Sequence, residues 1–167
     1  MLSASILCAA LFASDAPAQD VGASADVIAA WNTRANAIAT EKRDPPLSRA
    51  RSLAILHVAM FEAMNAIEGP DKLHTVNLSA DGHASVEAAA ATAAHAVLVA
   101  LNPEQTADLS SALAASLAGI ANGVPKARGY AAGKNAGAAV LARWLSTAAG
   151  KKDMARQIGG PTVDIGP

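Results

Sequence analysis

The sequence predicts an all-α protein, a bundle of about five helices. Three observations indicate this fold class. Apolar residues recur at the three-and-four spacing of a helix face, no stretch alternates over the length of a strand, and no repeat of fixed period appears. Hydrophobic residues make up 52% of the 167, many of them alanines, and aromatic residues only 3%. The core should therefore be built from closely approaching helix backbones rather than from bulky side chains.

The first 18 residues resemble a secretory signal peptide. An apolar run over residues 6–13 precedes a small-x-small sequence at residues 16–18, which favours cleavage after Ala18. We therefore expect a linker over residues 19–23 and an exported protein, periplasmic or secreted. The only cysteine, Cys8, lies in the signal, so neither a disulfide nor a cysteine nucleophile is expected in the mature chain. No later segment is apolar over about 18 residues, so no membrane span is expected after signal removal.

The predicted helical domain spans residues 24–149, and an irregular C-terminal tail follows over residues 150–167. Ser24 is expected to cap a first helix that ends near Thr40 and carries Trp31 as a packing anchor. The charged corner after this helix, residues 41–44, is interpreted as a solvated turn.

The helix between Pro45 and Gly69 is predicted to be the central helix of the bundle. Two prolines favour its first turn, and the glycine can adopt the left-handed conformation after its last turn. It carries two apolar stripes, so we expect several neighbouring helices to pack against it. Arg51 and Glu62 are expected to mark its one more solvent-exposed edge. The stripes are Leu47, Ala54, Val58 and Phe61, and Leu53, Leu56, Met60, Met64 and Ile67.

Three further helices are predicted after a long loop over residues 69–84. The first spans residues 85–101, the second is capped by Asn102 and stops at residues 122–123, and the third spans residues 125–148. In the last helix, glycines fall four apart on one ridge, where the absent side chains should let a neighbouring backbone approach closely. These glycines are Gly129, Gly133 and Gly137.

The segment from Gly129 to Asn135 invites comparison with a phosphate-binding loop but does not fit one. One residue is missing between its glycines, Asn135 stands where a Ser or Thr must hold magnesium, and no predicted strand precedes it. The helix-packing interpretation of these glycines is therefore preferred.

The four histidines, His57, His74, His83 and His95, form no metal-binding motif. There is no His-Glu-x-x-His pattern, and His57 and Glu62 are five residues apart. A metal site built from His57, His95 and a loop histidine is possible in three dimensions but has no support in the sequence. His57 is instead predicted to be a neutral imidazole bonded to a neighbouring backbone group or carboxylate.

Arg51, Glu62 and Asn65 share one side of the predicted helix 45–69 and are interpreted as a buried, hydrogen-bonded cluster between helices. No nucleophile, base and orienting group occur together, so no catalytic residue is assigned.

Thirteen basic and fourteen acidic residues give a formal net charge of -1, and there is no basic run. This charge pattern argues against nucleic acid as a partner.

The segment from Pro45 to Ile67 carries a family resemblance. It reads Pro-Pro-Leu-x-x-Ala-Arg-x-Leu-Ala-x-x-His-x-Ala-Met-Phe-Glu-Ala-x-Asn-Ala-Ile. This pattern resembles the N-terminal helical region of vanadium-dependent haloperoxidases and their bacterial relatives, within the type 2 phosphatidic acid phosphatase superfamily. The similarity continues through residues 88–103 and 122–143, and covers roughly residues 26–143. The scaffold positions of the family helix are matched by Arg51, His57, Glu62 and Asn65.

The resemblance implies an exported α-helical bundle that belongs to a larger enzyme. Full-length members oxidise halide with hydrogen peroxide at bound vanadate, and related members hydrolyse phosphate esters. In the family a lysine, two arginines and a Ser-Gly-His segment cradle the oxyanion, and a second histidine ligates vanadium. This sequence contains none of those motifs, so no catalytic, cofactor-binding or metal residue is carried over.

The expected role of this chain is accordingly the non-catalytic N-terminal half of a vanadium-dependent haloperoxidase-like enzyme, with no cofactor of its own. Its expected partner is the C-terminal catalytic half of the same protein or a homologous subunit, and a homo-oligomer is a further option. Two alternatives stay open at this point. One is a phosphatidic acid phosphatase-type phosphoester hydrolase, and the other is a stand-alone exported helical protein that binds a partner without catalysis.

Overall fold

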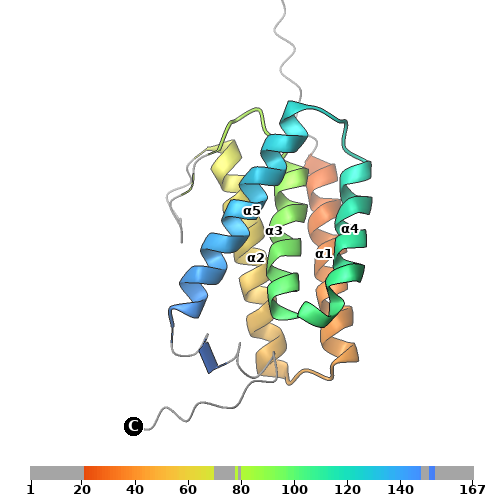
Figure 1. Ribbon diagram of the computed structural model, residues 1–167, viewed down its shortest axis with the longest axis vertical. Helices are drawn as coiled ribbons and strands as arrows, with labels where there is room; N and C mark the ends of the chain where they lie inside the picture. The colour runs from red at the N-terminus through yellow and green to blue at the C-terminus, as the bar shows by residue number, and fades with distance from the viewer. Residues whose placement is uncertain (1–20, 70–77, 79, 148–150, 153–167) are drawn as a thin grey trace, which may run out of the picture.

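The computed structural model describes residues 21–69, 78, 80–147 and 151–152 of the chain, and all secondary structure in this part is helical (Figure 1). Its long elements are five α-helices, which confirms the predicted all-α bundle. A short 3₁₀-helix, η1, joins the third helix to the fourth. The elements are α1 (Val21–Glu41), α2 (Pro46–Glu68), α3 (Val86–Leu101), η1 (Pro103–Gln105), α4 (Thr106–Ala118) and α5 (Val124–Leu145).

The central helix of the bundle is α3, which packs against all four other α-helices (Figure 1). Eleven of its sixteen residues are buried, and most of these are alanines. Because its six buried alanines have small side chains and lie on several sides of the helix, neighbouring helices can approach it closely. The prediction that α2 is central is therefore wrong. The helix α2 buries one apolar face and leaves part of its second stripe exposed, including Leu47 and Phe61.

The packing of α5 against α3 depends on the predicted glycine ridge. A Cβ atom added to Gly129 would lie 2.2 Å from the carbonyl oxygen of Ser85, and one added to Gly137 would lie 2.8 Å from the Cβ of Ala96. Both distances are too short for any side chain, so the ridge seats α5 directly on α3. The expected close approach of two backbones is confirmed.

The predicted ends of α2 and α3 agree with the structure. Gly69 follows α2 with φ +116°, and its N–H donates to the carbonyl oxygen of Asn65 at 3.2 Å. Ser85 caps α3, because its hydroxyl accepts a hydrogen bond from the N–H of Ala88 at 3.1 Å.

Other predicted ends differ from the structure. Ser24 lies inside α1 rather than before it, and α4 ends at Ala118, ahead of the predicted stop at residues 122–123. Asn102 makes no side-chain cap, because its amide donates to the carbonyl oxygen of Leu98 at 3.0 Å instead. For α4 an earlier glycine, Gly119, follows the last helical residue, and for Asn102 the contacts with Leu98 and Lys42 replace the predicted cap.

Several predicted segments lie wholly or partly outside the described residues. These include the signal peptide at residues 1–18, two residues of the linker, and the tail from residue 153 onward. Residues 21–23 of the predicted linker form the first turn of α1, and Lys151 and Lys152 are helical. Among the described helices, none combines the length and the apolar character that a membrane crossing requires.

Candidate functional site

A surface groove of about 390 Å³ lies between α2 and α5. Its floor is apolar, because Ile55 and Val140 are 7% and 5% exposed and Trp144 is half-buried beside them. Basic side chains from both helices, Arg51 and Arg143, line the same groove, and no acidic side chain of the described residues does. The groove therefore offers an apolar surface with positive charge beside it. The remaining lining residues are Ala54, Val58 and Thr147.

The groove is continuous with an apolar stripe on the outer side of α2. Ala54 and Val58 belong to both, and the stripe extends along the helix to Leu47 and Phe61, which are 69% and 46% exposed. We call Leu47, Ala54, Val58 and Phe61 the outer stripe. A contiguous apolar surface of this kind is typical of a site where another chain or segment packs.

The three polar residues that the sequence places on one side of α2 differ in their burial. Glu62 and Asn65 are buried, at 1% and 7% exposure, whereas Arg51 is half-buried and lines the groove. Eleven residues separate Arg51 from Glu62, or about 16 Å of helix rise. The prediction that Glu62 marks a more solvent-exposed edge of the helix is wrong, because Glu62 is buried. All three residues have polar or electrostatic interactions, which is the satisfied state expected of buried polar groups.

His57 is exposed on α2, and its Nε2 lies 3.1 Å from the side-chain oxygen of Asn32 on α1. Its partner is thus a side-chain amide rather than the predicted backbone group or carboxylate. The interaction links α1 to α2 at the surface.

His95 on α3 lies between α1 and α4. Its ring meets Trp31 edge to face, with the centroids 6.4 Å apart, and its Nε2 lies 3.4 Å from the hydroxyl of Ser110. Burial lowers the pKa of His95 below its ordinary value of 6.5. Trp31 is 2% exposed, which confirms its predicted role as a packing anchor.

The histidines do not assemble a metal site in the described part of the chain. No group of three or more His, Cys, Asp or Glu residues there could hold a metal ion. His83 lies in the turn before α3, where its backbone N–H donates to the carboxylate of Asp81 at 2.8 Å. His74 lies outside the described residues.

The corner between α1 and α2 is not the solvated turn that its charges predict. The ammonium of Lys42 donates to the side-chain oxygen of Asn102 at 2.9 Å and pairs with the carboxylate of Glu104 at 3.0 Å. The side chain of Gln105 also donates to the carboxylate of Glu41, at 3.3 Å. These contacts fasten the end of α1 to the junction of α3 and η1. Sequence reasoning missed them because each partner lies about 60 residues away.

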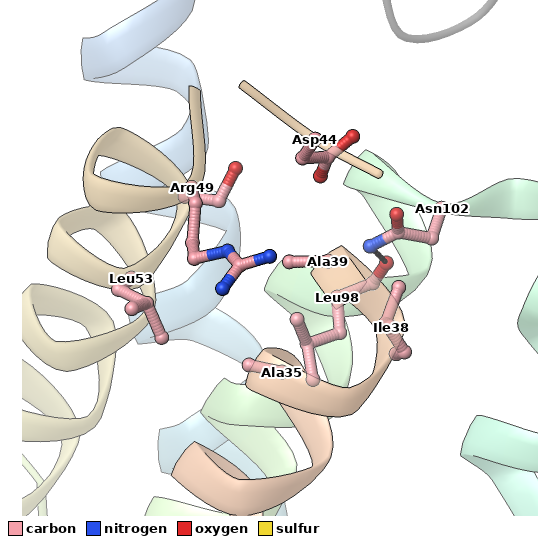
Figure 2. Close-up of a pocket in the computed structure, with 9 residues that line it drawn as sticks. Ala35, Ile38, Ala39, Asp44, Arg49, Leu53, Leu98 and Asn102 are labelled. Carbon is pink, nitrogen blue, oxygen red and sulfur yellow. Dashed lines mark hydrogen bonds between the residues drawn. The ribbon is translucent and has the colours of Figure 1, made fainter. Parts of the chain in front are cut away.

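A small cavity of about 10 Å³ lies beside this corner (Figure 2). Asp44, Arg49 and Asn102 provide polar groups in its wall, and the Nε atom of Arg49 is buried with no hydrogen-bond partner in the part of the chain that the structure describes. No local sequence pattern indicates this cavity, since its walls come from three helices. The other lining residues are Ala35, Ile38, Ala39, Ser52, Leu53 and Leu98.

The groove residues do not fit vanadate, the group that the family resemblance implies. Two arginines line the groove, but among the described residues no lysine or histidine, which the family uses with them, does. No catalytic step through vanadate follows from these residues.

The chain matches no protein-family model, no curated protein and no solved structure in three comparisons. The resemblance therefore rests on the sequence pattern of residues 45–67 and its continuation.

Proposed function

We propose that this chain is the N-terminal, non-catalytic helical portion of a vanadium-dependent haloperoxidase-like enzyme. In such an enzyme the oxidation of halide by hydrogen peroxide takes place at vanadate. The residues that bind vanadate would come from a segment C-terminal to this chain or from a homologous subunit. The described bundle would serve as a scaffold against which that catalytic part packs.

The observation that carries this proposal is the outer stripe on α2. The stripe belongs to the same segment, residues 45–67, that carries the family resemblance, and two of its large side chains, Leu47 and Phe61, are exposed. Fully burying a Leu or Phe side chain is worth about 1.5–3 kcal/mol relative to leaving it exposed. A catalytic part that covers the stripe would therefore gain stability from the contact.

The groove between α2 and α5 supports the same proposal. Its apolar floor and the exposed Arg143 suit an amphipathic segment that carries a carboxylate, because arginine pairs well with carboxylate. The groove and the outer stripe together would give the catalytic part a surface that is apolar and positively charged.

The test is the intact mass of the native protein in the cell envelope fraction, detected with an antibody against residues 45–69. A mass far above 16.7 kDa is the expected result. Peroxidase and phosphatase assays on that larger protein, with and without vanadate, then separate the haloperoxidase from the phosphoester hydrolase. A mass near that of this chain without residues 1–18 would overturn the proposal and favour a stand-alone exported binding protein.

A further inference from the structure

Two side chains of opposite charge, Asp44 and Arg49, line the small cavity at the corner of α1 and α2. Figure 2 shows the guanidinium of Arg49 reaching from α2 into the space beneath Asp44 and beside the end of α1. Within the described residues, Asp44 and Arg49 make no direct ion pair with each other. Two opposite charges that share a cavity without direct contact are a setting in which water bridges them.

The cavity has the size and the walls that one water molecule needs. Its volume of about 10 Å³ corresponds to about one water-sized probe. A buried water also needs two to four polar partners, and Asp44, Arg49 and Asn102 offer them. The Nε–H of Arg49 is the donor that most needs a partner, because it is buried and has none among the described residues.

We propose that a single long-lived water molecule binds in this cavity and bridges Arg49 to Asp44. The water accepts a hydrogen bond from Nε–H of Arg49 and donates one to the carboxylate of Asp44. A neutral molecule suits the site better than an ion, because Arg49 would repel a cation and Asp44 an anion. The cavity is also too small for a larger ligand.

This water would make the corner a closed polar junction between three helices. The backbone N–H of Asp44 donates a hydrogen bond, 2.9 Å long, to the carbonyl oxygen of Ala39 in the last turn of α1. Arg49 projects from the first turns of α2, and Asn102 follows α3. The bridge would therefore fix the start of α2 relative to α1 and α3. The inference is independent of the proposed function, because it uses only contacts within the bundle.

The first experiment is NMR on the unsubstituted full chain, which does not depend on the folding of any variant. We expect a cross-peak between water and the Nε–H of Arg49 with the sign of a water that stays bound for more than about a nanosecond. We also expect slow exchange of that proton with bulk solvent. A folded protein whose Arg49 Nε–H shows no such cross-peak, or exchanges as fast as an exposed arginine, would overturn the proposal.

A second experiment uses Arg49→Lys, which keeps the positive charge but places a methylene where Nε–H stands. We expect this variant to lose the water bridge and to raise the equilibrium constant for unfolding about 5- to 30-fold. The matched control is Arg34→Lys on the exposed side of α1, for which we expect less than about a 3-fold change. Equal effects of the two substitutions, or a crystal structure with a direct pair between Arg49 and Asp44, would contradict the inference.

Discussion

Gly133 of α5 faces the backbone of Ala89 of α3 so closely that a Cβ on the glycine would lie 2.2 Å from the alanine carbonyl oxygen. The same Cβ would lie 2.9 Å from the Cβ of Thr92. Backbone atoms cannot move aside as the end of a flexible side chain can. The distance between the two helices is therefore set by the absence of a side chain at this position.

We predict that Gly133→Ala destabilises the bundle, although alanine favours a helix over glycine by about 1 kcal/mol. The added methyl must push α5 away from α3, and overpacking of this kind costs about 1–3 kcal/mol, which over most of that range exceeds the propensity gain. Urea unfolding followed by circular dichroism measures the change. The matched control is Gly119→Ala, where nothing lies within 4 Å and φ is negative, so stability should stay level or rise. A Gly133→Ala variant as stable as this control would refute the close packing.

Lys42 provides a second test of packing, at the corner between α1 and α2. We predict that Lys42→Met lowers the free energy of unfolding by about 1–2 kcal/mol, because buried Asn102 loses a donor to its side-chain oxygen. The methionine keeps most of the apolar stem, so the effect reports the lost hydrogen bond and ion pair. The control is Lys134→Met on the exposed side of α5. Similar unfolding midpoints for the two variants would show that the corner is a solvated turn after all.

The neighbouring Arg43 adopts φ +55°, the left-handed conformation that non-glycine residues avoid. We predict that Arg43→Gly is neutral or stabilising by up to about 1 kcal/mol, because relief of this strain offsets the greater flexibility of glycine in the unfolded chain. Thermal unfolding measures the shift. A clear loss of stability would mean that the arginine side chain makes a contact more valuable than the strain is costly.

Much of this fold could be predicted from the sequence, because its signals are local. The five helices follow from apolar periodicity, the ends of α2 and α3 from Gly69 and Ser85, and the tight packing of α5 from its glycine ridge. Each of these features depends on residues within a few turns of one another.

The features that could not be predicted depend on which helices become neighbours. A helix with two apolar stripes, such as α2, is expected to be central, yet α3 has more helical neighbours because its alanines are small. Glu62 and Arg51 share a side of α2, but different neighbours surround them, so one is buried and the other lines the groove. The contact between Lys42 and Asn102 joins residues 60 positions apart, which no local pattern can indicate.

His95 makes the stability of the bundle depend on pH. Its pKa is lowered in the folded state by burial, so the unfolded chain binds a proton more readily. We therefore predict that the contribution of neutral His95 is fully present above about pH 6.5 and is lost as the pH falls from there through the lowered pKa. Urea unfolding between pH 7.5 and pH 5, at about half-unit steps, should show a smaller decline for His95→Gln than for the unsubstituted chain. Parallel declines for the two proteins would assign the pH dependence to other groups.

The outer stripe of α2 should contribute to association rather than to folding. We predict that the double variant Leu47→Ser, Phe61→Ser lowers the free energy of unfolding by only about 1 kcal/mol, because Leu47 and Phe61 are 69% and 46% exposed. By contrast, Leu56→Ala on the inner face, where the side chain is 0% exposed, should cost about 2–5 kcal/mol.

Light scattering on the isolated chain should show self-association that the double variant reduces and Leu56→Ala does not. If the double variant unfolds like Leu56→Ala, the stripe is part of the core. If it folds normally but associates as before, another surface mediates the contact, and the proposed packing of a catalytic part on α2 loses its support.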